Sequence, residues 1–379
     1  MIFKTTREGA LQDLENYINN EIVNYSTQRN FDFGPGKRKN VSCLSPYISH
    51  RLITEYEVAK KVLSKFPYQK VEKYIQEIFW RVYWKGWLEL RPQVWTDFTE
   101  DLKGIEEDKN YQIAVSGKTK IQCFNDWVNE LKENNYLHNH TRMWFASIWI
   151  FTLNLPWQKG AEFFMKHLYD GDAASNTLSW RWVAGLQTKG KHYIAQSWNI
   201  SKFTNNKYKN VKLNETALPI IDNRNYTISP IQINMNDELS EYLIVFDNEM
   251  HIQSFDLKRY KKIYFVLLNN KNRYLKLDSK VLDFKKKIIA SQLNNDEFES
   301  ELLDENGFTN LIEKSINFDV AYPSIGENLS FLKKLIKEKD LKINFIIRKE
   351  DEFCWKFSNK GYFNFKSNIP IILSTFKLN

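Results

Sequence analysis

The stretch at residues 165–185 has the sequence MKHLYDGDAASNTLSWRWVAG. Its Asp170-Gly-Asp172 turn precedes small residues, Asn176 and a Trp-x-Trp pair. Small residues let the backbone approach a large planar ligand closely, while the carboxylates and the amide address the polar edge of that ligand. An isolated Asp-Gly-Asp is more often an acidic turn before a buried helix. The sequence on either side therefore decides between a ligand site and a simple turn.

The chain up to this stretch has the periodicity of helices. Apolar residues recur at i, i+3, i+4 and i+7, and no strand-like alternation of any length interrupts them. The segments with this pattern are 9–25, 55–66, 71–83, 120–133, 141–152 and 160–168. Eleven of the twelve tryptophans lie before residue 200, the exception being Trp355, so the two halves of the chain differ in character. We predict an all-helical domain at residues 1–205.

The pattern changes after a segment rich in Asn, Pro and Thr, which we predict to be a linker at residues 206–237. Short β-branched and aromatic runs then alternate with helical patterns. The predicted strands are 242–246, 263–268, 318–322 and 343–347, and the predicted helices are 279–293, 307–315 and 328–339. Strands that alternate with helices imply crossover units and a parallel sheet. The predicted fold class is therefore α plus α/β, with a smaller α/β domain at residues 238–379.

Composition and charge exclude several classes of protein. Hydrophobic residues make up 42% and charged residues 26%, which excludes disordered and collagen-like chains. The apolar stretch at 143–157 is shorter than the ~18–20 residues of a membrane span, and the N-terminus has no apolar signal core. We therefore expect an intracellular, cytoplasmic protein without membrane contact. Three cysteines without a CxxC and six scattered histidines predict no metal site, and the net charge of +8 favours an anionic partner such as nucleic acid.

Five motifs within residues 1–200 resemble the FAD-binding helical domain of the cryptochrome/photolyase family, in the family's order and at matching spacings. They are Tyr25 with Arg29, Ser42-Cys-Leu-Ser-Pro-Tyr47, Glu77-Ile-Phe-Trp-Arg81, His138-Asn-His-Thr-Arg-Met143, and the run from Asp170 to Trp182. Any one of these motifs is weak, but five in register make a chance match improbable. Within the family, the chain is most similar to cyclobutane pyrimidine dimer photolyases.

The resemblance implies that FAD is the cofactor. The residues that it assigns to FAD are Tyr25, Ser42, Leu44, Ser45, Arg81, Asn139, Arg142, Asp170, Asp172 and Asn176. Backbone and hydroxyl groups of the Ser-x-Leu-Ser-Pro-Tyr loop would hold the phosphates. Arg142 and Asp170 would form an ion pair against the flavin, and Asp172 would hydrogen-bond its pyrimidine side. Asn176 would face flavin N5, where an asparagine is typical of repair enzymes.

The resemblance also implies a DNA substrate that contains pyrimidine dimers. Trp80, Asn139, Met143 and Trp182 would line the pocket for the flipped dimer, and Glu77 would stabilise the radical anion of the dimer. The (6-4) photolyases carry histidine at the places of Asn139 and Met143, which argues against (6-4) repair. We expect Arg29, Lys189 and Lys191 to contact the DNA backbone.

The sequence departs from the family in three ways, the smallest being His140 at a place where an arginine is common. Trp157 and Trp180 match the two inner members of the tryptophan chain that photoreduces FAD, and they complete the implied catalytic set with Glu77 and Asn176. The outer tryptophan would fall near Ala114, so either another aromatic residue replaces it, Tyr111 and Trp127 being close in sequence, or photoreduction is slow. Family members usually begin with an α/β antenna domain, whereas the α/β domain comes last here. A swapped antenna domain with a second chromophore and a plain packing module both remain open.

The sequence therefore predicts a DNA photolyase, a flavoprotein that repairs cyclobutane pyrimidine dimers by electron transfer from photoexcited reduced FAD. The alternatives are a cryptochrome-like blue-light photoreceptor without repair activity and a light-independent flavoprotein that binds nucleic acid. We expect the protein to act as a monomer.

Overall fold

The computed structural model describes residues 2–231, 240–293, 298–314, 317–339 and 341–378. The chain divides into two compact units, each built from stretches that are far apart in sequence. The first, called here the helical unit, comprises Asn16–Cys43 and Gln93–Tyr226 with the first three residues. The second, called the sheet unit, comprises Lys4–Glu15, Leu44–Pro92 and the chain from Thr227 onward. The predicted domains 1–205 and 238–379 stay a prediction, and residues 232–237 of the predicted linker lie outside the described part of the chain.

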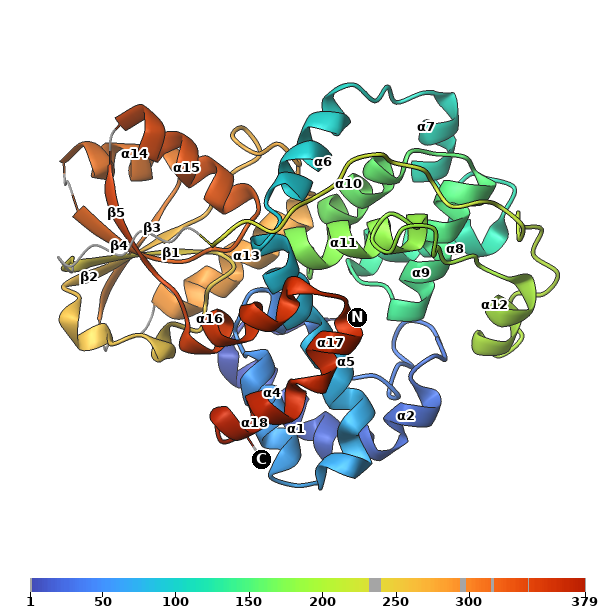
Figure 1. Ribbon diagram of the computed structural model, residues 1–379, viewed down its shortest axis with the longest axis horizontal. Helices are drawn as coiled ribbons and strands as arrows, with labels where there is room; N and C mark the ends of the chain where they lie inside the picture. The colour runs from blue at the N-terminus through green and yellow to red at the C-terminus, as the bar shows by residue number, and fades with distance from the viewer. Residues whose placement is uncertain (1, 232–239, 294–297, 315–316, 340, 379) are drawn as a thin grey trace. The chain divides into compact units, whose positions relative to one another are not determined.

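The helical unit consists of helices joined by short connections (Figure 1). Its elements are η1 (Ile22–Asn24), α2 (Tyr25–Gln28), α6 (Gln93–Lys103), α7 (Lys109–Val115), α8 (Gln122–Asn134), α9 (Asn139–Ser147), the π-helical turn η2 (Ile148–Thr152), α10 (Trp157–His167), α11 (Ala173–Ala184) and α12 (Ser197–Phe203). Helix α1 (Arg7–Asn20) crosses the boundary between the units. The predicted helix at 141–152 is thus an α-helix that ends in a π-helical turn, and no described residue of this unit lies in a strand.

The sheet unit contains a five-stranded, entirely parallel sheet with strand order β3-β2-β1-β4-β5. The strands are β1 (Tyr242–Phe246), β2 (Lys262–Val266), β3 (Glu299–Leu303), β4 (Asn317–Ala321) and β5 (Lys342–Ile346). The helices of this unit are α3 (Ser45–Ser49), α4 (Glu55–Leu63), α5 (Tyr68–Glu89), α13 (Ser279–Leu293), α14 (Glu305–Lys314), α15 (Glu327–Lys339), α16 (Lys349–Trp355), α17 (Tyr362–Ser367) and α18 (Ile369–Thr375), and its short 3-10 turns are η3 (Ile252–Ser254), η4 (Leu257–Arg259) and η5 (Lys356–Asn359).

Both faces of the sheet are covered by helices. Figure 1 shows α13 on one face of the sheet and α14 with α15 on the other. Because side chains alternate along a strand, Ile244 and Phe246 pack with Val320 and with Phe308 of α14 in one buried core. The intervening residues Leu243 and Val245 are buried as well. Burial on both faces is the reason that the central strands are continuous apolar runs, the property that predicted them.

The predicted fold class, α plus α/β, is confirmed, and four of the five strands lie within one residue of their predicted starts. The sequence analysis missed β3, whose sequence is ESELL. This strand lies at the edge of the sheet, and its Glu299 and Glu301 form ion pairs of 2.9 Å with Lys262 of β2. A charged edge strand lacks the apolar run that marks a buried strand.

Candidate functional site

The Asp170-Gly-Asp172 turn joins α10 to α11 and caps the second of these helices. Asp172 is the N-cap of α11, and its Oδ1 accepts a hydrogen bond of 2.8 Å from the N–H of Ser175. A carboxylate at this position satisfies an N–H that has no partner inside the helix, and it complements the positive end of the helix dipole. The hydroxyl of Ser175, one turn into α11, is buried and has no hydrogen-bond partner among the described residues.

Arg142 of α9 forms the predicted ion pair with Asp170. Its Nη2 lies 2.9 Å from Oδ2 of Asp170, and its Nε donates to the carbonyl oxygen of Leu137 at 2.9 Å. The guanidinium also lies over the ring of Tyr136, 5.2 Å from its centroid. The side chain of Asp170 is 1% exposed and that of Arg142 is 22% exposed. A buried carboxylate is therefore held by a cation that can still reach a bound molecule.

Asn176 extends from the first turns of α11 and is anchored by its amide. Its Nδ2 donates a hydrogen bond of 2.9 Å to the carbonyl oxygen of Ala161 in α10, and the residue is buried. No other side-chain hydrogen bond of Asn176 is found within the described residues. The amide oxygen is therefore held in a fixed direction, as a site that discriminates between ligands requires.

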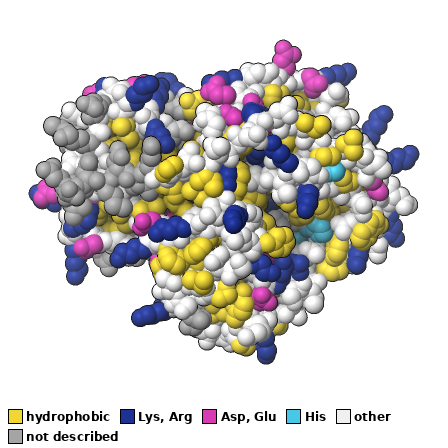
Figure 2. Space-filling model, viewed as in Figure 1, with side chains coloured by type: hydrophobic (Ala, Val, Ile, Leu, Met, Phe, Trp, Pro, Cys, Tyr) yellow, Lys and Arg dark blue, Asp and Glu magenta, His cyan; other side chains and the backbone are white. Residues whose placement is uncertain are grey.

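The other candidate residues of the helical unit lie at its surface or partly buried. Asn139, the first residue of α9, is exposed, while Met143 one turn later and Trp182 of α11 are half-buried. Trp182 stacks on Tyr193 with a centroid distance of 5.8 Å. Tyr25, Arg29 and Ser42 are half-buried, and Lys189 and Lys191 are exposed. Figure 2 shows that lysine and arginine side chains are spread over the visible face of the molecule.

The two tryptophans of the predicted electron path have different ring neighbours. Trp157 stacks on Phe98 at 5.5 Å, whereas Trp180 contacts Trp149 edge-on at 6.2 Å. Trp149 in turn contacts Tyr111 edge-on at 5.9 Å. Of the two aromatic residues that the sequence left open, Tyr111 is thus joined to Trp180 through Trp149. Trp127 stacks on Trp144 instead.

A glycine is required where Trp180 meets α10. A Cβ atom at Gly160 would lie 2.2 Å from Cη2 of Trp180 and 3.0 Å from Nε1 of Trp149. Real Cβ atoms do not approach other atoms this closely, so the close packing of α10 against α11 depends on this glycine. The sequence analysis did not single out Gly160, because a lone glycine within a helical pattern carries no signal of its partner.

Within the sheet unit, α5 presents Glu77 and Trp80 along one stripe. These residues are three apart, and Glu77 forms an ion pair of 2.8 Å with Lys73 one turn earlier. Glu77, Trp80 and Arg81 are all half-buried. Tyr362, the first residue of α17, stacks on Trp80 with a centroid distance of 3.4 Å and an interplanar angle of 12°. Sequence reasoning missed Tyr362, because its partner lies on a helix from the other end of the sequence.

The remaining predicted residues of this unit, Leu44 and Ser45, lie at the start of α3. Leu44 is buried as the N-cap residue, while Ser45 is half-buried. Among the described residues of both units, no helix is long and apolar enough to cross a membrane.

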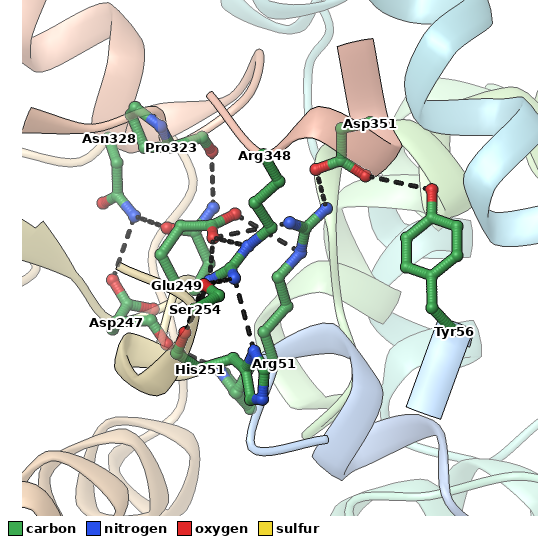
Figure 3. Close-up of polar contacts among 12 residues, drawn as sticks. Arg51, Tyr56, Asp247, Glu249, His251, Ser254, Pro323, Asn328, Arg348 and Asp351 are labelled. Atoms are coloured by element: carbon green, nitrogen blue, oxygen red, sulfur yellow. Dashed lines mark hydrogen bonds and ion pairs between the residues drawn. The ribbon is translucent and has the colours of Figure 1, made fainter. Parts of the chain in front are cut away.

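A cluster of buried charges, also missed by sequence reasoning, lies at the carboxyl end of β1 (Figure 3). Arg51 pairs with Glu249 at 3.3 Å and with Asp351 of α16 at 2.6 Å. Nε of Arg348 donates to Glu249 at 3.0 Å. Burial alone would lower the pKa of Arg51, but the carboxylates of Asp351 and Glu249 raise it. Arg51 therefore stays charged and joins β1 to α16.

This cluster occupies the position at which parallel sheets of this kind usually bind ligands. In the order β3-β2-β1-β4-β5, β2 and β3 are added on one side of β1, and β4 and β5 are added on the other side. Ligands of such sheets typically bind outside the carboxyl ends of the strands, at the point between β1 and β4 where the order switches. Here Asp247 follows β1 and is paired with Lys285 of α13 at 2.6 Å. Although burial would raise the pKa of Asp247, Lys285 and Arg273 hold it well below its ordinary value. The charges at this position are paired with one another, and both the swapped antenna domain and the plain packing module stay predictions.

The residues around α11 fit the polar edge of a flavin. They provide a guanidinium on Arg142, a carboxylate on Asp172, an oriented amide on Asn176 and the buried, unpartnered hydroxyl of Ser175. A flavin ring presents carbonyl oxygens and an N–H on its pyrimidine side, which require both donors and acceptors. This set provides both, so the residues present suit the cofactor that the sequence implied.

Comparison with known proteins also indicates an FAD-binding region. Residues 74–225 match the model of the FAD-binding domain of DNA photolyase. The chain is 30% identical over 184 residues to a deoxyribodipyrimidine photo-lyase of Agrobacterium fabrum, a match that covers 47% of this chain and 38% of the relative. It is 23% identical over 202 residues to the deoxyribodipyrimidine photo-lyase of Escherichia coli, covering 51% of this chain and 42% of the relative. The chain thus spans about two fifths of the length of these curated relatives.

Two solved structures are also similar to part of the chain. A class III photolyase from Agrobacterium tumefaciens matches with a TM-score of 0.46 and 25% identity, covering 53% of this chain and 43% of that one. A cryptochrome from Synechocystis matches with a TM-score of 0.48 and 20% identity, covering 54% and 44%.

Proposed function

The chain belongs to the cryptochrome/photolyase family through its FAD-binding region, and from this premise we propose that it repairs cyclobutane pyrimidine dimers in DNA with the energy of near-UV or blue light. The observation that carries the proposal is the stripe on α5, where the carboxylate of Glu77 lies one turn from the indole of Trp80. A flipped pyrimidine needs a flat apolar surface and a hydrogen-bonding group for its edge, and this stripe offers both. A photoreceptor that does not bind lesions has no need of the two together.

The residues of this chain bind and orient the flavin and the substrate, while the cofactor supplies the difficult chemistry. When bound, reduced FAD supplies the light-driven electron transfer that splits the dimer. Arg142, Asp172 and Asn176 hold the polar edge of the flavin, and Asp170 fixes the guanidinium of Arg142. In this proposal Trp80 of the sheet unit stacks against a flipped base, and the carboxyl group of Glu77 on the same helix hydrogen-bonds the base edge. The resemblance also assigns Trp182, Asn139 and Met143 of the helical unit to the binding of the dimer.

The exposed lysines of the helical unit contact the DNA backbone in this proposal. Lys189 and Lys191 lie on a surface loop after α11, and Arg29 follows α2. Phosphate contacts of this kind give affinity without sequence preference, and binding weakens as salt concentration rises because counterions are released. We therefore expect affinity for undamaged DNA to fall steeply with salt.

The test is loss of dimers under light. Purified protein with reduced FAD is illuminated with DNA that contains cyclobutane dimers, and the remaining dimers are counted against a dark control. We expect light-dependent loss, slowed several-fold in Glu77→Ala while its FAD content stays unchanged. Glu72→Ala, an exposed residue of the same helix, is the matched control and should repair at the wild-type rate.

The same experiment separates repair from the alternatives. A flavin spectrum without loss of dimers under light would contradict the proposal and favour a photoreceptor. Repair that is unchanged in Glu77→Ala would remove Glu77 from the reaction and leave repair itself standing.

A further inference from the structure

Tyr362 covers one face of the Trp80 indole. The two rings are nearly parallel at 12°, with centroids 3.4 Å apart, which is a full stacking contact. The hydroxyl of Tyr362 donates a hydrogen bond to the backbone carbonyl of Gln76, one turn before Trp80 on α5. Tyr362 is therefore attached to α5 at two points, by its ring and by its hydroxyl.

The segment that carries Tyr362 is packed firmly against α5. A Cβ atom at Gly86 would lie 2.9 Å from Cα of Trp355, so the backbones of α5 and α16 approach closely at this glycine. Tyr83 of α5 contacts Tyr362 edge-on at 5.4 Å and Phe365 of α17 at 5.6 Å. The position of Tyr362 is thus set by a buried aromatic cluster rather than by one contact.

Tyr362 lies beside both functional groups of the α5 stripe. Burial raises the pKa of its phenol, and the nearby negative charge of Glu77 raises it further. The phenol therefore remains a neutral hydrogen-bond donor. Tyr83 and Trp84 also contact the indole, with centroids 5.7 Å and 5.1 Å away. Trp80 is half-buried, so the exposed part of its ring is the part that these three neighbours leave uncovered.

We propose that Tyr362 is the positioning residue for Trp80: it occupies one face of the indole and holds the ring so that the exposed remainder receives the flipped base. This inference rests on the proposed function of the α5 stripe. A stacking surface that is already fixed loses less conformational freedom when a base binds, so the stacked pair binds a lesion more tightly than a mobile Trp80 would. The aromatic ring provides the stack, and Tyr83 still contacts that ring when the hydrogen bond to Gln76 is lost. Phenylalanine should therefore replace tyrosine at this position.

The test compares three variants of the full-length, FAD-loaded protein. Tyr362→Leu removes the stack, Tyr362→Phe keeps it, and Phe363→Leu is the matched control, because Phe363 is the next residue of α17 and is 85% exposed. The dissociation constant is measured in the dark for a single-stranded oligonucleotide with one cyclobutane dimer and for the same oligonucleotide undamaged. We expect Tyr362→Leu to weaken dimer binding about three- to tenfold and to leave undamaged DNA unaffected. Tyr362→Phe and Phe363→Leu should match the wild type.

A second measurement follows Trp80 itself, independently of DNA. The protein is labelled with 5-fluorotryptophan, and the ¹⁹F resonance of Trp80 is assigned by its loss in Trp80→Phe. We expect this resonance to shift in Tyr362→Leu and to keep its position in Tyr362→Phe. If Tyr362→Leu does not fold, Tyr362→Met fills the space without a flat ring and should give the same results.

Each outcome supports or overturns a distinct statement. Unchanged dimer affinity in Tyr362→Leu would overturn the positioning role, and tighter affinity would overturn it in favour of a residue that blocks the base. Wild-type protein that does not distinguish dimer from undamaged DNA would instead contradict the proposed function. In that case the ¹⁹F shift still decides whether Tyr362 holds Trp80.

Discussion

The hydroxyl of Tyr322 donates a hydrogen bond of 2.7 Å to the carboxylate of Glu89. Glu89 lies at the C-terminal end of α5, and Tyr322 directly follows β4, so this bond joins the helix to the carboxyl end of the sheet. The N–H of Ile325 donates a second bond, of 2.8 Å, to the same carboxylate. Both residues are buried, and the contact therefore links the protonation of Glu89 to the folding of the sheet unit.

Glu89 should make the sheet unit more stable at acidic than at neutral pH. Burial raises its pKa from 4.5 to about 7, although the bonds from Tyr322 and Ile325 oppose the rise. Between these values the folded protein binds more protons than the unfolded chain, so the free energy of unfolding falls as pH rises from 4.5 to 7. The free energy of unfolding falls by up to about 3 kcal/mol, because a pKa difference of one between the folded and unfolded states corresponds to about 1.4 kcal/mol.

The measurement is urea unfolding between pH 4.5 and 8, followed by a probe in the sheet unit. Glu89→Gln, which cannot ionise, should abolish the fall in stability over this range. Glu72→Gln on the exposed side of α5 is the control. A wild-type slope that persists in Glu89→Gln would show that another group titrates.

The helical unit should respond to acid in the opposite direction. Burial lowers the pKa of His138 from 6.5 to about 4, and its neutral Nδ1 accepts the N–H of His140 at the start of α9. The unfolded chain binds more protons than the folded protein between pH 4 and 6.5. The contribution of neutral His138 to the free energy of unfolding is therefore present above pH 6.5 and is lost as pH falls toward 4.

His138→Asn should remove the contribution of His138 to that loss, because asparagine caps a helix and does not titrate. Hydrogen exchange of amides in α9, measured at pH 4.5 and 7.5, reports the local stability. We expect protection to drop at pH 4.5 in the wild type and to drop less in His138→Asn, where His140 remains, because burial lowers the pKa of His140 as well. Equal drops in both proteins would exclude His138 as the titrating group.

Gly160→Ala should destabilise the helical unit by about 1 to 3 kcal/mol, because the added Cβ collides with the indole of Trp180. Replacement of Trp180 by phenylalanine removes the two ring atoms that meet this Cβ. The double variant Gly160→Ala/Trp180→Phe should therefore be more stable than the sum of the single effects, as a double-mutant cycle of melting temperatures would show. Additive effects would contradict the close contact.

Tyr111→Phe should slow the light-driven reduction of bound FAD several-fold. Tyr111 contacts Trp149, which contacts Trp180, and phenylalanine keeps the packing but is far harder to oxidise. The rate is followed by flavin absorbance under blue light with an external thiol as reductant. Trp127→Phe, whose ring lies against Trp144, is the comparison and should reduce at the wild-type rate. The reverse order of rates would assign the outer position to Trp127.

Local patterns in the sequence were sufficient for much of the fold. The central strands were predictable because both of their faces are buried, which makes them continuous apolar runs. The Asp170-Gly-Asp172 turn was predictable because a carboxylate at the start of α11 is favoured by backbone groups within one turn of it. The edge strand β3 escaped prediction, since its charged residues are stabilised by Lys262 on a neighbouring strand.

The sequence by itself thus determined the helical and parallel-sheet architecture, the family motifs and the residues around α11, since periodicity and short spacings encode them. The tertiary structure alone decided that Tyr362 stacks on Trp80, that Arg51 joins Glu249 to Asp351, and that Glu89 meets Tyr322. Each of these contacts joins segments that are far apart in the sequence. No local pattern records such a pair, because the packing of whole elements brings its members together and low-dielectric burial then sets their energies.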